Sequence, residues 1–179
     1  MASEVIRKLE KLIPFYRKLD KDQVGYTLLM DQQSEKVYKV EHGKTNQYSF
    51  WITWALLLAF MRMVKDVPLP MTDLKSFLIV ITSMIISGLI GVYKYNNVYK
   101  DKREVYYTEY VIREYIHEGK ALLKREVYST VMIFSIFAIL MALFVTYGWT
   151  VSLVFSLIFL GLFVYAACGL PLARFKLYK

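Results

Sequence analysis

The chain has 179 residues, of which 56% are hydrophobic, and its formal net charge is +8. This apolar fraction is above the usual range of soluble globular proteins, so the composition predicts a membrane protein. It disfavours a nucleic-acid-binding protein, because the short polar segments leave little room for a binding fold, and we expect the basic excess to face anionic lipid or to fix the topology.

The N-terminal segment, residues 1–47, is expected to contain no cleaved signal peptide, because residues 1–21 carry charges throughout and lack a continuous apolar stretch. Apolar side chains recur in residues 1–21 at helical spacing, with basic residues between them: Val5, Leu9, Leu12, Tyr16 and Leu19. This pattern predicts an amphipathic helix that either lies on anionic lipid or packs on protein.

Two short β-prone runs follow, at residues 26–30 and 37–40, on either side of a polar stretch. They predict a β-hairpin. Because an isolated hairpin is only marginally stable, we expect it to pack either on its own chain or on a second protein.

Four apolar runs have about the length, roughly 20 residues, that a membrane-crossing helix requires. They cover residues 48–64, 76–93, 127–147 and 150–170. The first run is the shortest and carries Arg62 near its end, where a long side chain can reach the headgroups. The other three contain no charged residue. We therefore predict an all-α membrane protein with a four-helix transmembrane bundle, helices 1–2 within residues 48–94 and helices 3–4 within residues 127–171.

The connections within the two helix pairs are short. Pro68 and Pro70 lie between the first and second apolar runs, so one continuous helix through both runs is excluded. Gly148 and Trp149 alone separate the third and fourth runs, so we expect a tight reversal with positive φ at Gly148. The third and fourth helices are therefore predicted to be antiparallel neighbours.

Residues 95–126 are predicted to form a helical insert, either a helical hairpin broken near Gly119 or extensions of the flanking helices. Residues 172–179 form a basic tail. Tyrosines make good protein contacts where they are exposed, although tyrosines more often pack in a chain's own core. The candidate contact residues of the insert are Tyr99, Tyr106, Tyr110 and Tyr115.

Lysine and arginine are distributed very unevenly between the two sides of the predicted bundle. Residues 1–47, 94–126 and 171–179 contain 20 of them, against three in the remaining segments. Positive charge is retained on the cytoplasmic side, so both termini and the insert are predicted to be cytoplasmic. The Lys, Tyr and Ile bias favours a low-GC bacterium, and hence a multi-pass protein of a bacterial cytoplasmic membrane.

The sequence indicates no catalytic, cofactor-binding or metal-binding residues. Cys168, the single cysteine, lies in an apolar run, so it has no disulfide partner and is a poor nucleophile. Glu114 and His117 form one Glu-x-x-His step, but a di-iron site needs two such steps and further carboxylates. We therefore expect a protein without enzymatic activity and without a cofactor, acting through a protein partner.

Small residues recur at helical spacing in three of the apolar runs, and such stripes let helix backbones approach closely. They are expected to form the bundle interior, or alternatively a contact with a partner or a second copy of the chain. The residues are Ser83, Ser87, Gly91, Ala138, Ala142, Ser152 and Ser156.

The β-prone hairpin over residues 26–40 is followed by an aromatic-rich first run that contains Tyr48, Phe50, Trp51 and Trp54. With the compact helical part after it, this layout resembles the small multispanning immunity proteins of Gram-positive bacteria, in particular the TsaI-like proteins. The chain departs from that layout by its four apolar runs and its long tyrosine-rich insert. The resemblance implies immunity against a membrane-active toxin. We expect the mechanism to be occupancy, in which the second to fourth helices pair with the toxin's membrane segment through the small-residue stripe and block insertion or pore formation. The alternative is an accessory subunit of a transporter or secretion complex that docks through the insert.

Overall fold

The computed structural model describes residues 12–18, 25–31, 34, 36–42, 47–64, 67, 69 and 73–178 of the chain. The chain divides into two compact units. We name them the sheet unit, Met1–Lys44, Lys94–Ser129 and Ala166–Lys179, and the helical unit, Thr45–Tyr93 and Thr130–Tyr165.

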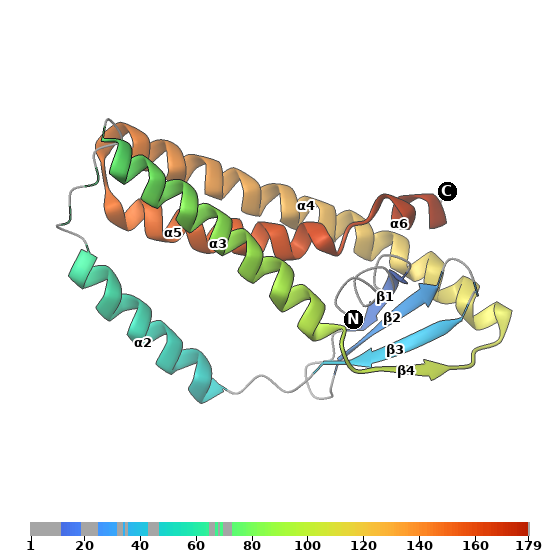
Figure 1. The fold of residues 1–179 in the computed structure, drawn as a ribbon. Coiled ribbons are helices and arrows are strands. Elements are labelled where there is room, and N and C mark those ends of the chain that lie inside the picture. Colours follow the sequence, from blue (N-terminus) through green and yellow to red (C-terminus); the bar gives the residue numbers. More distant parts are fainter. Residues whose placement is uncertain are drawn as a thin grey trace. The chain divides into compact units, whose positions relative to one another are not determined.

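The sheet unit contains a four-stranded antiparallel sheet whose strands lie side by side in chain order (Figure 1). The strands are β1 (Leu12–Lys18), β2 (Tyr26–Asp31), β3 (Val37–Glu41) and β4 (Lys102–Val105). The pairing of β2 with β3 confirms the predicted hairpin, with Met30 opposite Val37. β4 comes from the insert, which was predicted to be helical throughout, and it pairs with the outer edge of β3.

The amphipathic helix predicted over residues 1–21 is wrong in its described part, where the chain forms β1. β1 is an edge strand, and its register shifts between Pro14 and Tyr16. A proline is tolerated at such a place because it cannot donate to the ladder. Pairing with β2 therefore outweighs the helical spacing of Leu12 and Tyr16. The other residues of the predicted helix lie outside the described residues.

Both faces of the sheet are covered by other parts of the sheet unit. On one face, Phe15, Leu28 and Val37 pack against residues from α4 (Glu109–Tyr147) and α6 (Leu172–Leu177). On the other face, Leu29 and Val40 pack with Tyr99, next to the end of α3 (Leu74–Val98). Neighbouring residues of a strand point to opposite faces, so one short hairpin supplies both cores.

Parts of the insert extend α3 and α4, as one of the two predicted alternatives for residues 95–126 proposed. α4 runs without a break through Gly119. The predicted break at Gly119 is therefore wrong. A Cβ at this position would meet the Phe15 carbonyl and would lie 2.6 Å from the Tyr178 hydroxyl. Glycine thus allows strand β1 and the C-terminal segment to approach the helix.

The helical unit contains α2 (Gln47–Val64) and parts of α3, α4 and α5 (Thr150–Cys168). Among the described residues, α3, α4 and α5 are long and apolar enough to cross a membrane, and an 18-residue stretch of each has a mean hydropathy of 2.1, 2.3 and 2.4, respectively. The apolar stretch of α2, Phe50–Val64, is shorter. The described part of the chain is therefore mostly helical, with three helices that could span a membrane and a sheet larger than the predicted hairpin.

The connection between α4 and α5 confirms the predicted tight reversal. Gly148 adopts a φ of +67°, which favours glycine. Beyond the turn the two helices pack together: Phe144 and Leu153 share a buried cluster with Val80 of α3, and the rings of Phe134 and Phe163 lie 5.0 Å apart. α4 and α5 are thus antiparallel neighbours within the helical unit (Figure 1).

Candidate functional site

The small residues of α3 lie at a close contact with α5. Ser87 donates a hydrogen bond of 2.5 Å from its hydroxyl to the Leu157 carbonyl. A Cβ on Gly91 would lie 2.6 Å from the Gly161 carbonyl oxygen. The two helix backbones approach at this point because neither side carries a bulky side chain. Ser83 is half-buried on the same helix.

The two predicted serines of α5 are also buried inside the helical unit. Ser152 donates 2.7 Å to the Trp149 carbonyl, and Ser156, which is fully buried, donates 2.7 Å to the Leu153 carbonyl. These bonds satisfy the hydroxyls within one helix, so the serines can face a neighbouring helix as small residues. Ser156 also lies 3.7 Å from the Met141 sulfur of α4.

The two alanines of the predicted set behave differently. Ala138 and Ala142 are exposed on α4. The structure therefore places Ser87, Gly91, Ser152 and Ser156 in the bundle interior and leaves the two alanines on an outer face. Gly161, which completes the α3–α5 contact, was missed from the sequence because it does not continue the i, i+4 spacing of Ser152 and Ser156.

The four predicted tyrosines separate into two buried or half-buried residues and two exposed ones. Tyr99 is 2% exposed, and the rings of Tyr115 and Tyr16 lie 4.6 Å apart. Both tyrosines therefore belong to the chain's own core. Tyr106 and Tyr110 are 88% and 78% exposed, so these two remain available as contact residues.

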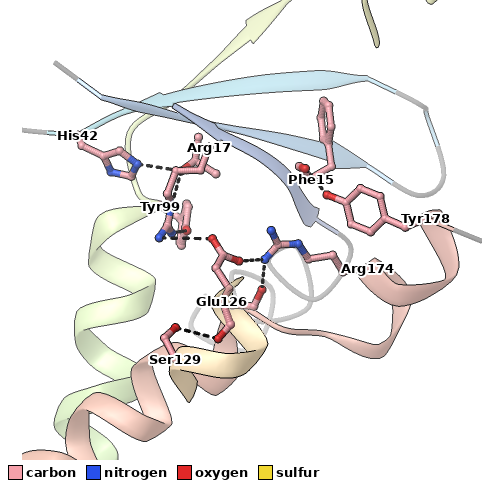
Figure 2. A network of polar contacts seen from close by, with 10 residues as sticks. Phe15, Arg17, His42, Tyr99, Glu126, Ser129, Arg174 and Tyr178 are labelled. Atoms are coloured by element: carbon pink, nitrogen blue, oxygen red, sulfur yellow. Dashed lines mark hydrogen bonds and ion pairs between the residues drawn. The ribbon is translucent and has the colours of Figure 1, made fainter. Parts of the chain in front are cut away.

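The sheet unit contains a polar network that the sequence analysis did not identify (Figure 2). Arg17 of β1 donates from Nε to the Thr27 hydroxyl at 3.2 Å and from Nη2 to the Tyr99 hydroxyl at 2.8 Å. Its Nη1 lies 3.8 Å from a carboxylate oxygen of Glu126. This one guanidinium thereby connects β1, β2, the end of α3 and α4.

Glu126 also contacts a second guanidinium, that of Arg174 in α6, at 2.5 Å. The same nitrogen of Arg174, Nη1, donates to the Gly169 carbonyl at 2.9 Å. Arg174 is only 3% exposed, and its Nε has no hydrogen-bond partner in the part of the chain that the structure describes. The predicted basic tail is thus a short helix whose arginine is buried in the sheet unit.

The C-terminal segment makes a second contact with the sheet. The Tyr178 hydroxyl donates to the Phe15 carbonyl (Figure 2). Both groups lie against Gly119 of α4. Leu177 packs on the Phe15 cluster. Leu177 and Tyr178 therefore connect β1 to α4.

His42, directly after β3, lies at the other end of the network. Its Nε2 is 2.8 Å from the Thr27 hydroxyl. Since that hydroxyl accepts from Arg17, it can donate its own proton to a neutral His42. Burial, together with the nearby Arg17 charge, lowers the pKa of His42 below its ordinary value. Both effects favour the neutral form of His42.

Chemically, the network favours a structural or binding role over acid–base chemistry. Its carboxylate already contacts two guanidinium groups, an arrangement that links elements and fixes their geometry. Across the described ranges, no group of three or more His, Cys, Asp or Glu side chains lies close enough to hold a metal ion.

Comparison with known proteins adds no assignment: no family model matches the chain, and neither a curated protein nor a solved structure matches it.

Proposed function

We propose that this chain crosses a bacterial cytoplasmic membrane four times, with the sheet unit on the cytoplasmic side. The pairing of β3 with β4 supports an even number of crossings between these strands, because hydrogen-bonded strands lie on one side of a membrane. α3 provides one crossing, and α2 is the only other described helix between them. At about 1.5 Å per residue, its 18 residues reach about 27 Å, close to the roughly 30 Å hydrocarbon core.

The same reasoning applies to the second helix pair. Tyr178 binds the Phe15 carbonyl of β1, so the C-terminus and the sheet share one side, and α4 and α5 supply two crossings between them. The sheet unit contains 20 of the 23 lysines and arginines. This charge bias supports a cytoplasmic location for the sheet unit and for both termini.

Within this topology, we propose that the protein acts by binding another protein rather than by catalysis, and that it confers immunity against a membrane-active toxin. The observation that carries this proposal is the surface of α2. Among the α2 residues with described side chains, only Met61 is buried, while Trp51 and Leu56 are 69% and 67% exposed. An apolar helix with so few contacts inside its own chain is suited to pair with a toxin's membrane segment.

This mechanism differs from the one expected from the sequence. The small-residue stripe of α3 is occupied by contact with α5, so it is not the surface that would meet a toxin. Apolar surface remains exposed on α2, on the side of α4 that carries Ala138 and Ala142, and on the side of α3 that carries Ile85 and Leu89. Occupancy of the toxin's membrane segment by these faces would block its insertion or pore formation.

The test is survival of the producing strain. Deleting the gene should make the cells sensitive to their own culture supernatant, and the intact gene should restore resistance. A photo-crosslinking residue in place of Leu56 should capture a secreted toxin, whereas one in place of the buried Ser156 should not. Unchanged survival of the deletion strain would contradict immunity.

A second candidate function is supported by the exposure of Tyr106 and Tyr110. Two large aromatic side chains that are 88% and 78% exposed at the start of α4 could dock a cytoplasmic component of a transporter or secretion complex. Purification in mild detergent would then yield a stoichiometric ATPase or permease, and replacing both tyrosines with serine should release it. Retention of that component by the double variant would contradict docking through these tyrosines.

A further inference from the structure

The two outer strands of the sheet are β1 and β4, and their edges differ. The register of β1 shifts between Pro14 and Tyr16, and the Phe15 carbonyl at this shift accepts a hydrogen bond from the Tyr178 hydroxyl. A proline, a register shift and a covering segment are means by which natural sheets keep further strands away from an edge. The edge of β1 is therefore protected.

β4 forms the opposite margin of the sheet (Figure 1) and lacks the first two of these features. It contains no proline, and it pairs with β3 without a register shift, from Val37 opposite Val105 to Val40 opposite Lys102. Within the described part of the chain, β3 is the only strand beside it. Because alternate main-chain groups of an edge strand point away from its neighbour, β4 offers them to a further strand.

The side chains of β4 indicate the chemistry of such a strand. Arg103 lies directly opposite Lys39 of β3, so two basic residues share one face of the sheet. Lys39 has its own acidic partner, since its Nζ lies 3.1 Å from the Glu41 carboxylate. Arg103 is exposed, and no ion pair of this residue is found among the described residues. Opposite charges stabilise a strand pair and like charges weaken it, so an acidic residue suits the position opposite Arg103 in an added strand.

The end of β4 adds an apolar requirement. Val105 follows Arg103 by two positions, so both residues share one face of the sheet, and Val105 packs at the border of the buried cluster on that face. An apolar residue opposite Val105 would extend this cluster. Tyr106, directly after β4, is 88% exposed and can pack on the end of an added strand. The strand that fits best therefore carries an acidic and an apolar residue two positions apart.

We propose that β4 binds an extended acidic segment of a cytoplasmic protein, which adds to the sheet as a further strand. Main-chain hydrogen bonds provide the affinity, and the residues opposite Arg103 and Val105 provide the selectivity. A second copy of β4 fits less well, because a twofold antiparallel pair brings one residue opposite its own copy, and Lys102, Arg103 and Glu104 would each meet a like charge. The inference rests on the proposed cytoplasmic location of the sheet unit but not on immunity.

The test is titration of the full-length protein in nanodiscs with fluorescein-labelled peptides, followed by fluorescence polarisation. The acidic probe is Thr-Val-Thr-Glu-Thr-Val-Thr, and the control peptide has lysine in place of glutamate. The acidic peptide should bind at least about tenfold more tightly than the lysine peptide. Arg103→Glu should reverse this preference. Arg113→Glu changes the charge of an exposed residue of α4 and should keep the preference of the wild type.

Backbone methylation separates strand addition from simple charge attraction. Two acidic peptides are methylated on every second amide nitrogen, in sets offset by one residue, so that only one set occupies the side facing β4. One methylated peptide should lose binding, and the other should bind like the unmodified peptide. Equal affinities of the two methylated peptides would overturn strand addition.

Three further outcomes would also overturn the proposal. They are no saturable binding of the acidic peptide, an unchanged preference in Arg103→Glu, and a spontaneous disulfide between two copies that carry Arg103→Cys in a Cys168→Ala background. The last would assign the edge to a second copy of the chain. Because the titration uses purified protein, an error in the proposed topology would be seen separately, by cysteine labelling in cells.

Discussion

Gly91 and Gly88 lie three residues apart on α3 but have opposite surroundings. A Cβ on Gly91 would lie 2.6 Å from a backbone oxygen of α5, whereas nothing lies within 4 Å of a Cβ on Gly88. Gly91→Ala should therefore force the two helices apart and lower stability by about 1–3 kcal/mol. Gly88→Ala should leave the unfolding temperature unchanged or slightly raised, because alanine is the better helix former. Thermal unfolding in detergent compares the two, and equal unfolding temperatures would contradict the close contact.

His42 should make the stability of the sheet unit depend on pH. Its folded pKa is lowered, so below the ordinary value of about 6.5 the unfolded chain takes up a proton that the folded chain resists. The stability that neutral His42 contributes is fully present above that pH and is lost as the pH falls toward the folded pKa. Between about pH 7.5 and about pH 5.5 the wild type should lose more stability than His42→Gln, whose amide can still accept from Thr27.

The measurement is the unfolding temperature of both proteins across that pH range, because other titrating groups are common to both and cancel in the difference. Parallel pH profiles for the two proteins would show that His42 is not held neutral by the network.

At the scale of elements, α6 connects the C-terminus to the sheet through buried groups. Replacing Arg174 with methionine removes a guanidinium that is 3% exposed, together with its 2.5 Å ion pair with Glu126. We expect a loss of about 2 kcal/mol, since one member of a largely buried pair is lost. Leu172→Ser, at an 82% exposed position of the same helix, is the matched control and should be neutral.

Hydrogen exchange locates the effect of this change. The amides of β1 should exchange faster in Arg174→Met than in Leu172→Ser, because α6 and Tyr178 contact that strand. Faster exchange confined to α5 would contradict the assigned role of α6 in holding the sheet.

The elements that the sequence predicted correctly are those with a strong local signal. Long uncharged runs predicted α3, α4 and α5, and the lone glycine between two such runs predicted the positive φ at Gly148. β1 and β4 were missed because their pairing partners decide their structure. β4 has four residues, Lys-Arg-Glu-Val, without an apolar alternation, and it exists as a strand because β3 offers an open edge.

The same distinction applies to the candidate site. Spacing along one helix selected Ser87 and Gly91, which contact α5, because the i, i+4 pattern is local. It also selected Ala138 and Ala142, which are exposed, because spacing does not say which face a neighbour covers. The contact of Arg17 with Glu126 joins residues distant in sequence, and no local pattern distinguishes these charges from their solvated neighbours.

At the scale of the whole molecule, the account depends on the number of membrane crossings. By hydropathy, three described helices qualify as membrane crossings: α3, α4 and α5. The β3–β4 pairing and the Tyr178–Phe15 contact, however, each require an even number of crossings between the paired segments. The proposal resolves this conflict by assigning the fourth crossing to α2. Asp73 and Trp149, both exposed, should then face outward, and Ser34 and Tyr110 should face the cytoplasm.

Cysteine labelling in intact cells tests this most directly, using single cysteines in a Cys168→Ala background and a maleimide that cannot cross the membrane. The account predicts labelling of Asp73→Cys and Trp149→Cys in intact cells, and labelling of Ser34→Cys and Tyr110→Cys only after permeabilisation. Protection of Asp73→Cys together with labelling of Trp149→Cys would show that α2 does not cross, and would contradict the four-span topology.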